Sequence, residues 1–235
     1  MNTSNTIIDV VIPAYNEEKS VPLVVKDIPS SVRNIVVVNN NSTDNTSANA
    51  QEAGAIVIDQ PLQGYGNACL KGIEYVNSLE QHPDIIVFLD ADYSDHPDEL
   101  DKVVFPIIKD GVDMVIGSRA LGSREKGSMM PQQRFGNWLA TGMIKLFYRH
   151  RFTDLGPFRA LKFDKLLELK MQDKTYGWTV EMQVKAVKLN FVCAEVAVSY
   201  RQRIGVSKIT GTIKGTVLAG WKIITTILKY TLKKV

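Results

Sequence analysis

Ile85-Ile86-Val87-Phe88-Leu89-Asp90-Ala91-Asp92 is the stretch that decides the fold. Its apolar, partly β-branched half predicts a fully buried strand at 85–89. Two carboxylates one residue apart follow the strand, and such a pair repels unless a cation lies between its members. Mg²⁺ and Mn²⁺ prefer oxygen ligands of this kind and also bind phosphate oxygens. The stretch therefore predicts a divalent-metal site on Asp90 and Asp92, with a simple polar turn as the alternative.

Similar apolar runs lie on both sides of this stretch, and segments with helical spacing separate them. The runs predict strands at 7–12, 34–38, 55–58, 114–116 and 191–199. The segments predict helices at 17–27, 43–53, 68–78, 97–109, 132–148 and 176–189, with a turn at 153–158. Alternation of this kind predicts an α/β fold with a mostly parallel sheet flanked by helices. Ligands of such sheets bind beyond the carboxyl ends of the strands.

The composition bounds the function. The chain has 235 residues, which fits one domain plus a short appendage, and its net charge of +3 is too small to indicate nucleic-acid binding. The two cysteines are far apart in the sequence and belong to no Cys/His cluster, so we expect reduced thiols rather than a disulfide framework or a zinc site. The first residues lack the pattern of a signal peptide. We therefore expect a cytoplasmic protein.

Polar residues follow the other predicted strands as well. Pro13 ends the first strand, and Tyr15 and Glu17 beyond it offer a ring and a carboxylate to a nucleoside. Asn40 lies in an Asn-rich turn after the second strand, where an amide suits a base edge. Each of these is also ordinary turn chemistry. The glycines of Gly64-Tyr65-Gly66 allow close backbone approach. Neither a Gly-x-Gly-x-x-Gly motif nor a Gly-Lys-Ser/Thr loop follows the first strand, which argues against dinucleotide dehydrogenases and P-loop enzymes.

Cationic groups dominate the second half of the sequence. They are Gly117-Ser118-Arg119, Gln133-Arg134, Asp154 with Arg159, and Arg201 and Arg203 with Ser207-Lys208. Arginine forks match phosphate geometry, although each of these arginines is equally typical of a solvated surface.

We expect a domain at 1–211, followed by a separate C-terminal unit at 212–235. Apolar residues recur there at helical spacing, lysines accompany them, and no acidic residue follows Tyr200. The pattern predicts an amphipathic helix that either rests on anionic lipid or packs on protein. The stretch 216–232 is short and charged for a helix that spans a membrane.

Taken together, the motifs resemble those of the family 2 glycosyltransferases of GT-A fold, and most closely the dolichyl-phosphate mannose synthase branch. The resemblance runs from about Ile7 to Lys208. Its markers are Val11–Glu17, Asn41–Asp44, Asp90–Asp92, Gly117–Arg119, Arg134 with Asn137, Asp154 with Phe158-Arg159, Glu181-Met182, and Glu195-Val196 through Arg203 to Ser207-Lys208.

The resemblance implies roles for individual residues in an inverting, metal-dependent transfer from a UDP- or GDP-sugar. It assigns Pro13, Tyr15, Glu17, Asn40 and Asp90 to the nucleotide, and Asp90 and Asp92 to Mg²⁺ or Mn²⁺. It assigns Asp92, Asp154 and Arg119 to catalysis, and Arg119, Arg134, Arg203 and Lys208 to the acceptor or its phosphate. The family usually has two aspartates where Asn39 and Asn40 lie, which leaves the base open.

The acceptor that the resemblance implies is a polyprenyl or dolichyl phosphate, approached from the inner face of the membrane. Its oxygen is already ionised, so no general base is required. A soluble or saccharide hydroxyl acceptor is the alternative, with Asp154 or Glu181 as the candidate base. The runs Gly156–Arg159 and Tyr176–Trp178 differ from the usual pattern of the branch and leave this choice open. A nucleotide-sugar-binding module without turnover is a third alternative, against which the intact Asp90 and Asp92 argue.

Overall fold

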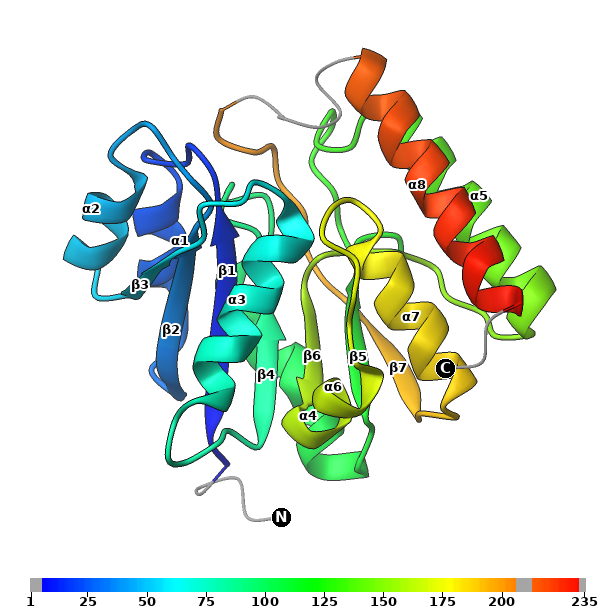
Figure 1. Cartoon of the computed structure of the whole chain (residues 1–235), viewed down its shortest axis with the longest axis horizontal. Helices are drawn as coiled ribbons and strands as arrows, with labels where there is room; N and C mark the ends of the chain where they lie inside the picture. The colour runs from blue at the N-terminus through cyan, green and yellow to red at the C-terminus, as the bar shows by residue number, and fades with distance from the viewer. Residues whose placement is uncertain (1–5, 206–212, 233–235) are drawn as a thin grey trace.

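The computed structural model describes residues 6–205 and 213–232, so Lys208 lies outside the described residues. A seven-stranded sheet in the order β3-β2-β1-β4-β6-β5-β7 runs through the described part of the chain (Figure 1). Its strands are β1 (Ile8–Ala14), β2 (Val32–Asn39), β3 (Ile56–Asp59), β4 (Ile85–Phe88), β5 (Met114–Ser118), β6 (Arg159–Lys162) and β7 (Cys193–Ala197). β6 is antiparallel to β4 and β5, and the remaining pairs are parallel. The predicted α/β fold with a mostly parallel sheet is confirmed.

Helices cover both faces of this sheet (Figure 1). They are α1 (Val21–Asp27), α2 (Thr46–Glu52), α3 (Tyr65–Asn77), α4 (Leu100–Asp110) with a preceding 3₁₀ turn (Pro97–Glu99), α5 (Pro131–Tyr148), α6 (Phe163–Leu169), α7 (Trp178–Lys188) and α8 (Ile213–Leu232). Two apolar cores result, because successive strand residues point to opposite faces. Val11 belongs to the core under α3, α5, α6, α7 and α8, whereas Val10 belongs to the core under α1, α2 and α4.

The helix α3 lies unusually close to the sheet. A Cβ atom added at Gly72 would lie 2.4 Å from a methyl carbon of Val11, which is far inside van der Waals contact. Glycine at this position therefore allows the helix to approach β1 and β2. The first turn of α3 is thereby fixed at the carboxyl edge of the sheet.

The C-terminal helix α8 lies beside α5 and packs against α7 (Figure 1). The hydroxyl of Tyr148 on α5 donates to the carbonyl of Ile227 at 2.6 Å, and Tyr230 is buried with 3% of its surface exposed. The predicted C-terminal helix is confirmed over the residues described. Among those residues, no helix combines the length and the apolar character that crossing a bilayer requires.

The element missing from the sequence-based prediction is β6, together with α6 after it. β6 is a four-residue strand with the sequence Arg159-Ala160-Leu161-Lys162, too short and too charged to stand out by its pattern. Tertiary contacts create it, since it fills the gap between β4 and β5 and pairs with both. The predicted strand at 191–199 is also shorter, at Cys193–Ala197.

Candidate functional site

The polar residues that follow the strands meet at one edge of the sheet, the upper edge in Figure 1. Parallel strands bring their carboxyl ends to that edge, and the antiparallel β6 begins there, since Arg159 pairs with Phe88 and Ile116. Asp90 and Asp92 follow β4, and Asp154 precedes β6. The structure therefore gathers residues that are distant in the sequence, as the strand-end rule predicts.

Asp90 carries a carboxylate oxygen, Oδ1, that is buried and has no hydrogen-bond partner among the described residues. Burial, followed by the charge of Asp92, raises the pKa of Asp90 to about 7. The buried hydroxyl of Tyr65, on the first turn of α3, lies near this carboxylate. Burial, followed by the charge of Asp90, raises the pKa of Tyr65 well above its usual range. Burial and the charge of Asp92 thus outweigh the nearby guanidinium groups of Arg203 and Arg119, and a bound cation would favour the ionised form of Asp90.

Asp92 is 4% exposed, and both of its carboxylate oxygens have partners. Oδ1 accepts from the backbone N–H of Ser94 at 2.9 Å and from the hydroxyl of Ser94 at 2.5 Å. Oδ2 forms an ion pair with the guanidinium of Arg203, and the same guanidinium lies 3.9 Å from the carboxylate of Glu17. Arg203 therefore places positive charge between the carboxylates predicted for the nucleotide and for the metal.

Backbone contacts fix the segment that carries Arg203. The N–H of Arg201 donates to the carbonyl of Ser94 at 2.9 Å, and the N–H of Ile204 donates to the carbonyl of Asp92 at 3.0 Å. The guanidinium of Arg201 stacks on the ring of Tyr93 at 3.4 Å from its centroid. These contacts hold residues 200–204 against the carboxylate turn, so the position of Arg203 beside Asp92 is built into the fold.

The residues present fit a divalent cation that is shared with a ligand. The unsatisfied oxygen of Asp90 and the nearby carboxylate of Asp92 are hard oxygen donors of the kind that Mg²⁺ and Mn²⁺ bind. Asp95 is 1% exposed, both of its oxygens lack partners among the described residues, and burial, followed by the charge of Asp90, raises its pKa well above the usual range. No group of three or more His, Cys, Asp or Glu side chains in the described ranges is arranged to hold a metal alone.

The residues predicted for the nucleotide lie at the ends of β1 and β2. Glu17 is 7% exposed, and its backbone N–H donates to the hydroxyl of Thr46 at 2.7 Å. Pro13 and Tyr15 are half-buried. The side chain of Asn40 is engaged with the following loop: it donates to the carbonyls of residues 60 and 62 at 3.0 and 2.8 Å and accepts from the N–H of Gly64 at 2.7 Å. Asn40 therefore shapes this part of the edge through the protein's own backbone.

Arg119 and Asp154 form a buried bidentate ion pair. Two guanidinium nitrogens of Arg119 lie 2.8 Å from the two oxygens of Asp154, and its backbone N–H donates to the same carboxylate. The guanidinium also lies over the ring of Tyr200, 5.0 Å from the centroid. Burial acts to raise the pKa of Asp154, but Arg119 outweighs it, and the pKa is lowered. A fully buried, ionised and paired carboxylate is a poor proton acceptor, so we assign Asp154 a positioning role toward Arg119.

Two of the predicted site residues are structural. Arg159 is completely buried and donates to the carbonyls of Leu155, Gly156 and Thr179, and burial lowers its pKa to about 10. The prediction that it handles an anion is wrong, because its donors are used within the core. Glu181 is also completely buried. Its carboxylate forms an ion pair with Lys185 and accepts a hydrogen bond from the hydroxyl of Tyr230. The prediction that Glu181 is an alternative base is wrong, because its carboxylate is buried and its oxygens are bound within the protein. Arg134 is exposed on the first turn of α5.

The fold and the carboxylate pair after β4 define an α/β glycosyltransferase of GT-A type. The crystal structure of glucosyl-3-phosphoglycerate synthase from Mycobacterium tuberculosis, in complex with Mn²⁺, UDP and phosphoglyceric acid, superposes with a TM-score of 0.77 at 20% identity and covers 98% of this chain and 80% of that chain.

The family is shown by sequence. The family model described as Glycosyl transferase family 2 matches residues 9–169. An uncharacterized glycosyltransferase of Mycobacterium bovis is 34% identical over 222 residues, which cover 92% of this chain and 97% of that protein. The undecaprenyl-phosphate mannosyltransferase of Micrococcus luteus is 27% identical over 218 residues, with 87% and 88% covered. The chain belongs to glycosyl transferase family 2, and it is a glycosyltransferase.

Proposed function

We propose that the protein transfers a sugar from a UDP- or GDP-sugar with inversion, and that Mg²⁺ or Mn²⁺ is required. The observation that carries this proposal is the unsatisfied, buried oxygen of Asp90 beside Asp92 and Arg203. The structural neighbour bound to Mn²⁺ and UDP has the same fold, which supports a divalent ion and a nucleotide at this edge. When bound, the ion supplies electrostatic stabilisation of a diphosphate leaving group.

The chain's own residues have distinct tasks in this proposal. Asp90 and Asp92 hold the ion, and Ser94 orients Asp92 through two hydrogen bonds. Arg203 neutralises Asp92 and is the cation placed to meet a diphosphate that arrives beside Glu17. Asp154 holds Arg119 at the amino end of β6, where a fixed guanidinium suits an anionic acceptor. Lys208 and Arg134 remain proposed contacts of the acceptor's phosphate.

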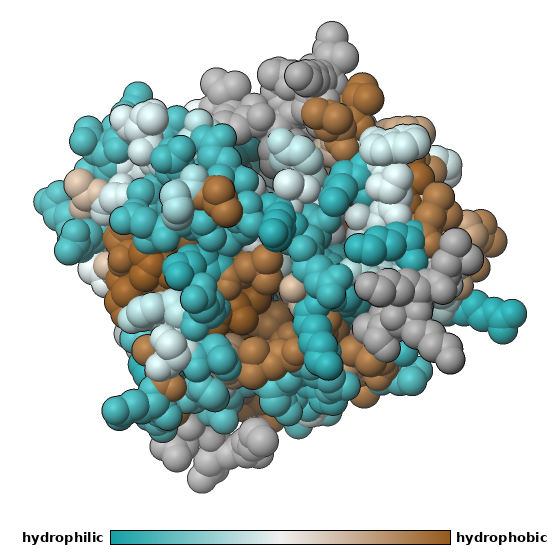
Figure 2. Space-filling model, viewed as in Figure 1, coloured by the Kyte–Doolittle hydropathy of each residue, from teal (hydrophilic) through white to brown (hydrophobic). Residues whose placement is uncertain are grey.

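The acceptor that we propose is a polyprenyl phosphate. Its support is the α5–α8 apolar surface, which comprises the exposed residues Phe135, Trp138, Leu146, Phe147, Val217, Leu218, Trp221 and Leu228. Figure 2 shows apolar side chains along the margin of the molecule where these two helices lie. Single exposed apolar residues are common on protein surfaces, but a group of them on adjacent helices indicates contact with lipid or protein.

The charge of these two helices favours lipid. Neither α5 nor α8 contains an aspartate or a glutamate, whereas Arg134, Lys145 and Lys229 are exposed on them. Basic side chains beside exposed tryptophans suit the headgroup region of an anionic membrane. We therefore propose peripheral contact with the inner face of the membrane. The Micrococcus luteus relative, whose name gives undecaprenyl phosphate as its substrate, supports the same acceptor class.

A soluble acceptor is the second candidate. The structural neighbour contains phosphoglyceric acid, a small acceptor that carries a phosphate and a carboxylate. A fixed Arg119 at the acceptor side would suit this anion as well. Such an acceptor reacts through a hydroxyl and needs a base, and the burial of Asp154 and Glu181 argues against both predicted bases.

The donor and acceptor are tested together by a transfer assay. UDP- and GDP-sugars are first screened for thermal stabilisation with Mn²⁺, and the donors that bind are then offered undecaprenyl phosphate in detergent or 3-phosphoglycerate. We expect transfer to the lipid phosphate, with loss of activity when EDTA is added. Transfer to phosphoglycerate alone would refute the lipid acceptor and favour the soluble one. Donor binding without transfer to either acceptor would indicate a nucleotide-sugar-binding module.

The membrane contact is tested by sedimentation with anionic vesicles. We expect the double variant Trp138→Ser, Trp221→Ser to lose most of its vesicle binding while it keeps nucleotide binding. Phe105→Ser is the matched control, since Phe105 is 50% exposed on α4 at the other face of the sheet. If the unaltered protein stays in the supernatant, or if the control loses as much binding as the double variant, the lipid contact is refuted.

A further inference from the structure

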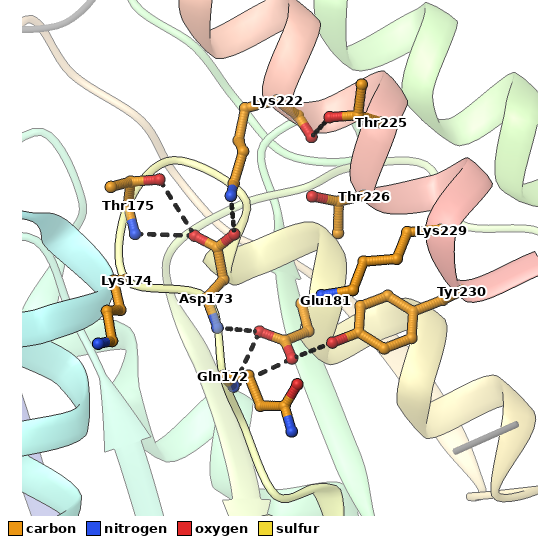
Figure 3. Close-up of a pocket in the computed structure, with 10 residues that line it drawn as sticks. All are labelled: Gln172, Asp173, Lys174, Thr175, Glu181, Lys222, Thr225, Thr226, Lys229 and Tyr230. Atoms are coloured by element: carbon orange, nitrogen blue, oxygen red, sulfur yellow. Dashed lines mark hydrogen bonds and ion pairs between the residues drawn. The ribbon is translucent and has the colours of Figure 1, made fainter. Parts of the chain in front are cut away.

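A polar cavity of about 400 Å³ lies between the loop 172–175, α7 and α8 (Figure 3). It contains the buried carboxylates of Asp173 and Glu181, and neither residue lies in the site described above. Figure 3 shows side chains of α8 entering it from one side and the loop closing it from the other. The cavity is therefore the joint between the C-terminal helix and the rest of the domain.

Asp173 joins the loop to α8. One oxygen of its carboxylate lies 2.9 Å from the ammonium of Lys222 on α8. The other oxygen accepts from the backbone N–H groups of Thr175 and Gly177 at 2.8 and 3.1 Å. The carboxylate is 6% exposed and the side chain of Lys222 is 42% exposed, so the ion pair is buried on the loop side and reaches solvent on the side of α8. The position of the loop is thus tied to the position of Lys222.

Glu181 supplies a second connection beneath the first. Its carboxylate accepts from the backbone N–H groups of Gln172 and Asp173, at 3.0 and 2.6 Å, and from the hydroxyl of Tyr230 on α8 at 2.6 Å. The ammonium of Lys185 lies 2.7 Å away. This buried network keeps α8 in place when the Lys222 contact is removed, because Tyr230 does not depend on it.

The other side of the loop rests on the first turn of α3. The carbonyl of Lys174 accepts from the N–H of Asn67 at 3.1 Å. A Cβ atom added at Gly66 would lie 2.0 Å from the carbonyl oxygen of Asp173, and one added at Gly64 would lie 2.3 Å from that of Lys174. The two backbones are therefore in direct contact, and no side chain separates them.

That first turn of α3 belongs to the proposed donor site. Gly64 donates to the side chain of Asn40 at 2.7 Å, and Tyr65 brings its hydroxyl near Asp90. A shift of the loop 172–175 must consequently move the residues that surround the predicted nucleotide and metal positions. A series of contacts leads from Lys222 through Asp173 and the carbonyl of Lys174 to Asn67, which shares the first turn of α3 with Tyr65.

We propose that Asp173 and Lys222 are positioning residues for the donor site, which act through the loop 172–175 on the first turn of α3. This inference rests on the proposed function for the identity of the ligand, but the contacts that carry it do not. It gives the C-terminal helix a task in the reaction besides surface contact. Loss of the ion pair loosens the α3 turn and weakens donor binding, while the acceptor side keeps its geometry.

The test compares two lysines of the same helix. Lys222→Met removes the ion pair and keeps an apolar side chain. Lys229→Met is the control, because the ammonium of Lys229 lies 5.0 Å from the centroid of the Tyr230 ring and is not part of the contacts between Lys222 and Asn67. We expect Lys222→Met to weaken binding of UDP or GDP with Mn²⁺ about fivefold and to raise the donor KM with little change in kcat. Asp173→Asn should do the same, and the double variant should be no worse than either single one.

Two further measurements separate positioning from simple loss of stability. Hydrogen exchange at the amide of Asn67 should accelerate in Lys222→Met without nucleotide, and Lys222→Arg should restore both slow exchange and affinity. Unchanged exchange at Asn67, or an equal loss of affinity in Lys229→Met, would overturn the inference. If the wild-type protein binds neither UDP nor GDP, the proposed function is refuted. Hydrogen exchange at Asn67 would still show whether Lys222 influences the first turn of α3.

Discussion

Arg203 and Asp92 form one of the contacts through which the two halves of the sequence meet at the site. Their ion pair joins the turn after β4 to the segment after β7, and Glu17 lies 3.9 Å from the same guanidinium. The charge of Arg203 acts to lower the pKa of Asp90 and so offsets part of the repulsion between Asp90 and Asp92. The carboxylates are therefore held close together before any ligand arrives.

Asp92→Asn tests the role of this carboxylate. The amide keeps an oxygen for Ser94, so the turn should persist, but it offers a metal ion much less charge. We expect turnover of the donor with Mn²⁺ to fall by at least about a hundredfold. Asp98→Asn, which alters a carboxylate that is 64% exposed on the following 3₁₀ turn, should leave turnover unchanged. Full activity of Asp92→Asn would remove the metal from the mechanism.

The buried pair of Arg119 and Asp154 has a consequence for acid stability. The folded pKa of Asp154 lies below its unfolded value, because Arg119 outweighs the effect of burial. The pair thus stabilises the folded state above about pH 4, and this contribution is lost as the pH falls through the lowered folded pKa. Asp154→Asn lacks this contribution and leaves Arg119 unpaired at a cost of about 3–5 kcal/mol.

We therefore expect two results when thermal unfolding is followed between pH 3 and pH 7. Asp154→Asn should have a lower Tm at pH 7, and its Tm should fall less steeply than that of the wild type below pH 4. Asp98→Asn serves again as the exposed control. If Tm changes with pH in the same way in Asp154→Asn and in the wild type, the ion pair with Arg119 does not stabilise the folded state.

At the scale of the elements, the close packing of α3 on the sheet depends on Gly72. Gly72→Ala would place a methyl group 2.4 Å from Val11, and we expect overpacking to cost about 1–3 kcal/mol. Gly142→Ala on α5 is the matched control, because nothing lies within 4 Å of its added Cβ. There the better helix propensity should stabilise the protein by about 0.5–1 kcal/mol. Thermal unfolding measures both, and a loss of stability in both variants would contradict this interpretation.

The sequence predicted the elements that have a strong pattern of their own. The apolar run before Asp90 and the helix after it were recognisable, and the metal role of the two aspartates stays a prediction. β6 was missed because its four residues form a strand only between β4 and β5. The assignment of Arg159 failed for a related reason: the carbonyls that surround it come from distant segments.

The pairings within the site were equally hidden in the sequence. Nothing local marks Arg203 as the partner of Asp92 or Arg119 as the partner of Asp154, since these pairs are joined only when the sheet forms. Tyr65 was visible only as part of a glycine-rich turn, and its place near Asp90 follows from the approach of α3 to the sheet. Residue types at strand ends thus predict the chemistry of the site, whereas its internal partners require the tertiary structure.

For the whole molecule, ligand binding and folding are linked, because the proposed donor site draws on both halves of the chain. We expect Mn²⁺ together with UDP or GDP, at about 100 times the dissociation constant, to stabilise the folded state by about 2.7 kcal/mol. Chelation with EDTA should remove most of that gain, because the unsatisfied oxygen of Asp90 then loses its cation. Differential scanning calorimetry measures the shift, and an equal gain with nucleotide and EDTA would exclude a role of the ion in binding.

The reversed direction of β6 makes this part of the fold open to change. Since β6 runs against β4 and β5, the segment that precedes it, rather than the one that follows, ends at the ligand edge. A change in the length of the segment before residue 154 would alter the side chains at the ligand edge. The pairing of β6 with β4 and β5, which begins at Arg159, would keep its register. In the proposed function this segment lies on the acceptor side, so a change of its length would alter acceptor binding and leave the strands that carry the donor residues in place.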